Sequence, residues 1–416
     1  MTSPIEFSTS VLRTSFRKTA LTGLLIYMLT LLAGTTTQAQ TFEVIHSFAR
    51  LNLGFSPYGG LVQDARGNLY GTTNDGGGYG TGSVYELTHG QSGWIMTALV
   101  EFRHDGNGYS PAARLTLGPD GAFYGTTAYG GSQACGNGCG TIFRLNLASS
   151  GRTVIYRFSG QSDGSTPLGA LSFDSAGNVY GTTETGGVGG NGTVFKLVRN
   201  GNQWTHSVIH NFDGANGWEP VAGVTVDSAG NLYGTTVNGG AGNSFGVVYE
   251  LSPSSGGWSY RLLHTFSGGS DDGESSEAGL IMDAAGNLYG ATQGGGSGYS
   301  GTVFELSPSG DNWSYRTICN LTGPGNLPGP RGSLVMDAAG NLYGATANDG
   351  AYGQGSVFKV VQSNGDWACY TIHDFNSPDD GANPFGDLML DAHGNVFGTA
   401  WSGGPYGGGT AWEVIP

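Results

Sequence analysis

One ten-residue motif recurs seven times along this chain and constrains its fold more than any other feature. It first appears as residues 64–73 (DARGNLYGTT), and its aromatic-Gly step returns every 53 to 56 residues. The aromatic residues of this step are Tyr70, Tyr124, Tyr180, Tyr233, Tyr289, Tyr343 and Phe397. A fixed period of this length indicates one supersecondary unit copied head to tail, in which each copy buries its apolar faces against its neighbours.

Each copy predicts four short antiparallel strands. In the fifth copy the strands are expected at 279–283, 288–292, 302–306 and 313–318. The Gly-Asn pair within 284–287 supplies a tight turn, because both residues tolerate the positive φ that such a turn needs. Four antiparallel strands per unit are typical of a β-propeller blade.

The two ends of the repeat region predict how the ring closes. The last copy stops after its third strand, at 410–415, and residues 41–48 read as an isolated fourth strand. The His46–Phe48 segment matches His264–Phe266 at the end of a fourth strand inside the chain. The predicted fold is therefore all-β: a seven-bladed β-propeller with four antiparallel strands per blade, closed by the N-terminal strand completing the last blade. The alternative, an open solenoid, would need polar capping units, and neither end resembles one.

Residues 1–39 differ from the rest of the chain. Three basic residues precede an apolar run at 20–32, and small and polar residues follow it up to Ala39. This is the layout of a secretory signal peptide, and the run is short for a membrane span. We expect residues 1–39 to be a signal peptide and 40–416 a secreted, cell-surface or periplasmic propeller without membrane insertion after cleavage.

The repeat also resembles a known group of proteins. Residues 283–292 (DAAGNLYGAT), the following Gly-Gly step and 301–306 (GTVFEL) are similar to the GloVer-type tandem repeat of exported bacterial proteins. The similarity covers essentially all of the mature chain. It implies export and propeller architecture, and it implies no particular activity.

The charge balance excludes two classes of partner. Only 11% of the 416 residues are charged, the formal net charge is −15, and the lysines are Lys18, Lys196 and Lys359. Nucleic acids and anionic membranes require a cationic face, so neither is expected as a partner.

Two repeated polar positions are interpreted as structural. Six copies begin the motif with Asp, and the second has Gly118; we expect each Asp to accept hydrogen bonds from its own turn. Four fourth strands carry His at one register, where Val100, Tyr156 and Cys319 stand in the other copies. A position that accepts Val and Tyr is expected to be a packing position. The histidines are His46, His210, His264 and His373.

The cysteines suggest one disulfide. Cys135 and Cys139 lie in a single glycine-containing loop, and in an exported protein a small disulfide is expected there. Cys319 and Cys369 fall on fourth strands of different blades. Because we expect those strands to diverge, both are predicted to be unpaired and buried.

The loops that join one blade to the next are rich in Asp and Gly, most of all around Asp271, Asp272 and Glu274, with Glu277 close behind. Oxygen ligands suit hard cations, so a Ca²⁺ site at these three residues is one interpretation. Good turn formation by Asp-Gly is the other, and it is favoured. No further cofactor is indicated.

Aromatic residues interrupt the repeat on the face that carries the longest loops. Trp218 beside Glu219, Trp401 and Tyr109 are the candidate ligand-binding residues, because aromatic rings pack on the apolar face of a sugar. The predicted function is a non-catalytic binding module for an extracellular glycan or protein. The alternatives are a polysaccharide-acting enzyme using Glu219 or Glu184, since glycoside hydrolysis needs paired carboxylates, and a structural envelope component.

Overall fold

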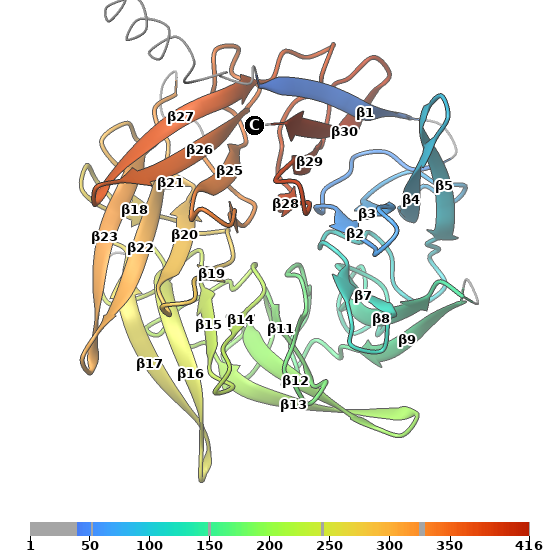
Figure 1. Cartoon of the computed structure of the whole chain (residues 1–416). Coiled ribbons are helices and arrows are strands. Elements are labelled where there is room, and N and C mark those ends of the chain that lie inside the picture. Colours follow the sequence, from blue (N-terminus) through green and yellow to red (C-terminus); the bar gives the residue numbers. More distant parts are fainter. Residues whose placement is uncertain (1–39, 51–52, 149–150, 243–244, 324–328, 416) are drawn as a thin grey trace, which may run out of the picture. The chain divides into compact units, whose positions relative to one another are not determined.

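The computed structural model describes residues 40–50, 53–148, 151–242, 245–323 and 329–415. The predicted signal peptide therefore lies outside the described residues. Within Thr41–Pro416, seven four-stranded antiparallel sheets are arranged around an axis as the blades of a β-propeller (Figure 1). No helix in the described ranges is long and apolar enough to cross a bilayer.

The blades are numbered in chain order, and their strands are given from the inner to the outer edge. Blades 1 to 3 consist of β2 (Val62–Gln63), β3 (Leu69–Thr73), β4 (Ser83–Gly90) and β5 (Gly93–Glu101); β6 (Thr116–Leu117), β7 (Phe123–Thr127), β8 (Thr141–Asn146) and β9 (Gly151–Arg157); and β10 (Ser172–Phe173), β11 (Val179–Thr183), β12 (Thr193–Asn200) and β13 (Gln203–Asn211).

Blades 4 to 7 follow the same order. They consist of β14 (Thr225–Val226), β15 (Leu232–Thr235), β16 (Val247–Ser254) and β17 (Gly257–Thr265); β19 (Ile281–Met282), β20 (Leu288–Thr292), β22 (Thr302–Ser309) and β23 (Asn312–Asn320); β24 (Val335–Met336), β25 (Leu342–Thr346), β26 (Ser356–Ser363) and β27 (Asp366–Asp374); and β28 (Met389–Leu390), β29 (Val396–Ala400), β30 (Gly407–Ile415) and β1 (Thr41–Ala49). A small two-stranded sheet, β18 (Gly273–Glu274) with β21 (Gly294–Gly295), accompanies blade 5.

The predicted closure of the ring is confirmed. The N-terminal strand β1 pairs antiparallel with β30, with Phe42 opposite Val414 and Thr41 opposite Ile415. Figure 1 shows the blue β1 beside the dark red end of the chain. The fourth strand of blade 7 comes from the N-terminal end of the chain. Backbone hydrogen bonds therefore join the two ends of the propeller sequence and close the ring.

The hydrophobic core lies between the blades. Among the described residues the buried apolar side chains form seven clusters, and each cluster combines two neighbouring blades. Between blades 4 and 5, for example, Tyr233 and Phe266 pack with Leu288 and Phe304. Burying a side chain such as Phe304 contributes about 1.5–3 kcal/mol. No blade could bury these residues alone, which explains the strict repeat.

The glycine of each Tyr-Gly or Phe-Gly step leaves room for an aromatic ring of the next strand. Gly290 lies opposite Phe304, and a Cβ atom on Gly290 would come within 2.4 Å of the Phe304 ring. The same close approach occurs in every blade, between Gly71 and Tyr85, Gly125 and Phe143, Gly181 and Phe195, Gly234 and Tyr249, Gly344 and Phe358, and Gly398 and Trp412. The motif therefore repeats glycine because the ring occupies the space of a side chain.

The Asp that begins each motif holds its own turn, as expected. In blade 5 Asp283 accepts hydrogen bonds from the backbone N–H groups of Ala285 (2.9 Å) and Asn287 (2.8 Å). Its second oxygen accepts the Tyr289 hydroxyl at 3.2 Å. In blade 2, where Gly118 replaces the Asp, Asp120 accepts from Tyr124 and Ala122 instead. These carboxylates are therefore structural.

The outer strands of neighbouring blades contact each other at one register. His264 of β17 stacks on Tyr315 of β23, with ring centroids 3.7 Å apart. The equivalent pairs Tyr156–His206, His210–Tyr260 and His373–Phe42 stack in the same way. The repeated histidine position is thus a packing position between blades.

The prediction that Cys319 and Cys369 are unpaired and both buried is wrong. Their sulfur atoms form a disulfide between β23 and β27, with the Cα atoms 6.1 Å apart, and Cys369 is exposed. The outer strands do not diverge at this register, since it is the one at which His264 and Tyr315 stack. In the described part of the chain no cysteine is free.

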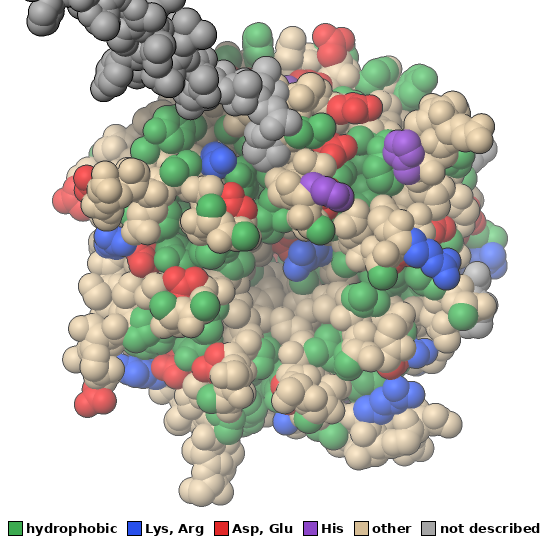
Figure 2. Space-filling model, viewed as in Figure 1, with side chains coloured by type: hydrophobic (Ala, Val, Ile, Leu, Met, Phe, Trp, Pro, Cys, Tyr) green, Lys and Arg blue, Asp and Glu red, His purple; other side chains and the backbone are tan. Residues whose placement is uncertain are grey.

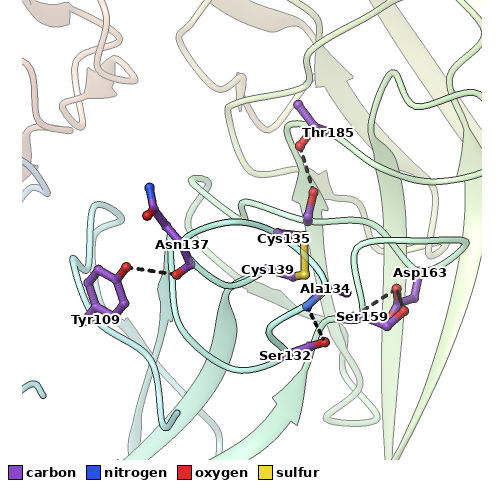
Figure 3. Close-up of a disulfide and its surroundings, with 10 residues drawn as sticks. Tyr109, Ser132, Ala134, Cys135, Asn137, Cys139, Ser159, Asp163 and Thr185 are labelled. Atoms are coloured by element: carbon purple, nitrogen blue, oxygen red, sulfur yellow. Dashed lines mark hydrogen bonds between the residues drawn. A yellow bond between two sulfur atoms is a disulfide. The ribbon is translucent and has the colours of Figure 1, made fainter. Parts of the chain in front are cut away.

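Cys135 and Cys139 also form a disulfide, with Cα atoms 5.2 Å apart. Figure 3 shows that it closes the loop between β7 and β8. The Tyr109 hydroxyl donates a hydrogen bond of 2.9 Å to the carbonyl of Asn137 in this loop. The disulfide and this hydrogen bond together hold the loop between β7 and β8 in place.

Candidate functional site

A cavity of about 640 Å³ lies where the seven blades meet, and segments from all of them line it. Figure 2 shows the molecule hollowed near the centre of the face in view. The lining comes mainly from the short segment that precedes the innermost strand of each blade. In six blades this segment begins with proline, and in blade 5 it begins with Ser276. The prolines are Pro57, Pro111, Pro167, Pro220, Pro330 and Pro384.

The residue that follows this proline breaks the sevenfold symmetry. Blades 2, 3 and 4 carry the apolar residues Ala112, Leu168 and Val221 there. Blades 5, 6, 7 and 1 carry instead Glu277, Arg331, Phe385 and Tyr58. One half of the cavity wall is therefore aromatic and charged, and the other half is aliphatic.

The aromatic residues of this wall contact one another around Arg331. The Arg331 guanidinium lies over the Phe385 ring, 4.9 Å from its centroid. The Tyr58 ring contacts Phe385, with centroids 5.5 Å apart, and Trp401, which does not itself line the cavity, packs on Phe385 with centroids 5.7 Å apart. Burial raises the pKa of the Tyr58 phenol, and the charge of Glu277 raises it further. These rings offer a hydrophobic surface beside a fixed positive charge.

Carboxylates provide the opposite charge. Glu277 forms an ion pair of 3.4 Å with Arg331 and accepts a hydrogen bond from Gln293 at 3.3 Å. Within the described residues, no hydrogen bond or ion pair engages the carboxylate of Glu184, which also lines the cavity. Burial raises the pKa of Glu184, and the negative charges of Glu219 and Glu277 raise it further. Burial likewise raises the pKa of Glu277, and Arg331 opposes part of that rise.

A second ion pair lines the same cavity. Its residues, Arg114 and Asp387, stand two positions after Ala112 and Phe385 in their segments. Arg114 Nε lies 3.6 Å from Asp387, whose other oxygen accepts the backbone N–H of Ser333 at 2.7 Å. The Nε atoms of Arg114 and Arg331 are buried, and in the described chain neither donates a hydrogen bond. The second ion pair thus adds a further positive and a further negative charge to the cavity lining.

The four residues proposed from sequence occupy different places. Trp401 packs on the lining residue Phe385, and the charge of Glu219 acts on Glu184 and Glu277. The Glu219 carboxylate accepts a hydrogen bond from Asn238 at 2.5 Å. Trp218, beside it, is 40% exposed. Tyr109 lies in the segment between β5 and β6, donates a hydrogen bond to the disulfide loop and contacts His104 and Tyr129.

The three residues considered for Ca²⁺ do not share one environment. Asp271 is exposed, whereas Asp272 is buried and accepts hydrogen bonds from His264, the Ser267 backbone N–H and the Gly273 backbone N–H. Burial alone would raise the pKa of Asp272, but the hydrogen bonds from His264 and Ser267 lower it to about 2. Glu274 lies in β18. Across the described ranges, no group of three or more His, Cys, Asp or Glu residues is placed to hold a metal ion.

Sequence reasoning missed Tyr58, Arg331 and Phe385. The signal was present in the repeats, because these residues stand where other copies have Ala112, Leu168 and Val221. Finding it requires an alignment of the seven segments that precede the innermost strands, and these segments are less regular in sequence than the motif. Only the ring then brings the four deviating copies to one side of a cavity.

The repeat matches one protein family over almost its whole length. The model of the Gloeobacter/Verrucomicrobia repeat matches residues 26–205, 134–284 and 170–412. The chain belongs to the Gloeobacter/Verrucomicrobia repeat family. The resemblance drawn from residues 283–292 and 301–306 is thereby confirmed. No curated protein matches this Gloeobacter/Verrucomicrobia repeat chain.

Solved structures similar to this family member come from proteins of different kinds. The extracellular domain of a putative hybrid two-component system from B. thetaiotaomicron is 13% identical over 89% of this chain, with a TM-score of 0.56, and the chain spans 39% of its length. A fungal alcohol oxidase of the AA5 family, in complex with copper, is 16% identical over 91% of this chain and 76% of its own, with a TM-score of 0.55. A putative 6-phosphogluconolactonase from Bacteroides uniformis is 14% identical over 75% and 82%, with a TM-score of 0.50. Such likeness establishes the fold alone, and the fold hosts enzymes and binding domains alike.

Proposed function

We propose that this protein is an exported, non-catalytic binding module that holds the end of an extracellular glycan in the cavity on the propeller axis. The observation that carries the proposal is the contact of Tyr58 and Phe385 in the cavity wall, with Arg331 over the Phe385 ring and Trp401 packed on Phe385 from outside the lining. Aromatic faces pack against the apolar face of a sugar ring, while carboxylates and a guanidinium take its hydroxyl groups.

Two further observations support the proposal, one for the site and one for export. Sites for small ligands are concave and carry a few convergent polar groups, and Arg331, Glu277 and Glu184 line this cavity. The two disulfides support export, because such cross-links persist in oxidising compartments.

The test is to incubate the mature chain (40–416) with a panel of insoluble and soluble polysaccharides and to measure both retention and newly released reducing ends. Retention without release is the expected result. Phe385→Ala and Trp401→Ala should each weaken retention about tenfold, whereas Tyr370→Ala, an exposed tyrosine of the outer strand β27, should not. Unchanged retention by Phe385→Ala and Trp401→Ala would refute the site, and no retention on any polysaccharide would favour a protein-binding or structural role.

A polysaccharide-acting enzyme is the second candidate, and one observation favours it. Glu184 and Glu277 line the same cavity, and both have a raised pKa, which is the property of a carboxyl that donates a proton near neutral pH. Release of reducing ends that Glu184→Gln abolishes would establish this function in place of binding alone.

A further inference from the structure

Among the described residues, five tyrosines are exposed on the loops between the second and third strands of consecutive blades, and four of them lie at the same turn of the loop. The fifth, Tyr129 of blade 2, is 37% exposed, stands at another position and packs against Tyr109. Tyr299, Tyr352, Tyr406 and Tyr79 belong to blades 5, 6, 7 and 1, and their exposed fractions range from 49% to 65%. Blades 7 and 1 are neighbours, since Phe48 and Tyr85 pack together across their interface. The four tyrosines therefore form one uninterrupted arc. Single exposed aromatic residues are ordinary, but a repeated one in adjacent blades is not.

The loops present these side chains on defined turns. Tyr79, Tyr352 and Tyr406 hold the same position, just before the glycine whose N–H closes the turn: Gly80 to Gly77, Gly353 to Gly350, and Gly407 to Gly404. In blade 5 Tyr299 itself closes the equivalent turn, onto Gly296. In blade 3 the corresponding position is Gly189, and the adjacent exposed residue is Val188.

The tyrosine arc covers the same blades as the altered cavity wall. Glu277, Arg331, Phe385 and Tyr58 come from blades 5, 6, 7 and 1, as the four tyrosines do. Both sets of loops lie on one face of the disc, because antiparallel strands place the second-to-third loop and the link to the next blade at the same end. These four tyrosines and the altered cavity wall therefore lie on the same four blades and on one face.

We propose that Tyr299, Tyr352, Tyr406 and Tyr79 form a track for an extended polysaccharide chain whose end occupies the axial cavity. This inference rests on the proposed function and specifies its ligand as a polymer. A single sugar held in the cavity does not need exposed rings on the loops between the second and third strands, whereas a longer chain offers further sugar units for them. Each tyrosine presents a flat apolar face and a hydroxyl group to successive sugar units.

Tyr352 and Tyr406 are the best positions for a test. Arg103 lies over the ring of Tyr79 at 4.1 Å and already occupies one face of it. No ring contact, ion pair or side-chain hydrogen bond engages Tyr352 or Tyr406 in the described part of the chain. Their truncation to alanine should therefore leave the fold intact, and an unchanged melting temperature checks this.

The experiment measures affinity as a function of chain length. Cello-, xylo-, manno- and chito-oligosaccharides of two and six sugars are titrated into the full mature chain by calorimetry. For the series that binds, the wild type should bind the hexamer at least tenfold more tightly than the dimer. Tyr352→Ala/Tyr406→Ala should remove that gain and leave dimer affinity unchanged. Val188→Ala, on the equivalent loop of blade 3, should keep both affinities.

The outcomes separate this inference from the proposed function. Equal affinity for dimer and hexamer, or a length gain that survives in the double variant, would overturn the track while the cavity remains the binding site. No binding in any of the four series would overturn both. Binding of the hexamer that depends on Tyr352 and Tyr406 but not on Phe385 would move the site from the axis to the arc and refute the proposed chain end.

Discussion

Cys319 and Cys369 are joined across two blades at the register where His264 and Tyr315 stack in the preceding pair of blades. Cys319 faces Val303 in its own blade as His264 faces Val248, and Cys369 faces Val360 as Tyr315 faces Leu306. A covalent bond thus takes the place of a ring stack between outer strands. The same contact point between neighbouring blades is thus occupied by a ring stack in one pair of blades and by a disulfide in the next.

Removing this disulfide should destabilise the ring. Cys319→Ser/Cys369→Ser should lower the free energy of unfolding by about 2–4 kcal/mol, because the bond closes a long loop of the unfolded chain. Cys135→Ser/Cys139→Ser is the matched control and should cost less, since only four positions separate those residues. Chemical denaturation of the three proteins measures the difference. An equal loss in both double variants would contradict the loop-length argument.

Adding a single methyl group at Gly290 should lower the free energy of unfolding. Gly290→Ala would place its Cβ against the Phe304 ring, and overpacking of this kind costs about 1–3 kcal/mol. Gly256→Ala is the control, because nothing lies within 4 Å of a Cβ there. Urea titration of both variants tests the prediction, which fails if Gly290→Ala is as stable as the control.

The unpaired carboxylate of Glu184 should make stability depend on pH. Its pKa is raised in the folded protein, so the ionised group opposes folding at neutral pH. That penalty is complete above the folded-state pKa and is lost as the pH falls through it towards the unfolded value of about 4.3. Glu184→Gln should therefore raise the melting temperature at pH 7 and leave it unchanged near pH 4. A rise of the same size at both values would show that charge is not the cause.

Asp272 should behave in the opposite way, and without calcium. Its pKa is lowered to about 2, so its stabilising effect is present above the unfolded value of about 3.9 and is lost as the pH falls towards 2. Asp272→Asn should lower the melting temperature at pH 7, because hydrogen bonds from His264 and Ser267 weaken. Since these donors already occupy its oxygens, adding Ca²⁺ or a chelator should not shift the wild-type transition. A clear shift with Ca²⁺ would restore the metal interpretation.

The local elements of the fold could be predicted because they depend on contacts close in sequence or repeated at a fixed spacing. Asp283 holds its own turn, Gly290 faces the ring of the adjacent strand, and each motif recurs at a nearly constant interval. Closure of the ring by residues 41–48 could also be predicted, because the last copy lacks a fourth strand and these residues supply one. The repeat alone determines blade content, blade number and closure.

The site and the second disulfide depended on geometry that the repeat does not encode. Whether Cys319 reaches Cys369 is decided by how closely two outer strands approach, and that distance comes from the packing of the core between the blades. Tyr58 and Phe385 are more than 300 positions apart, yet closing the ring places their rings side by side. The sequence by itself determined the unit and the number of its copies. The tertiary structure decided which departures from the unit meet, because only the closed ring converts positions along the chain into neighbours around one axis.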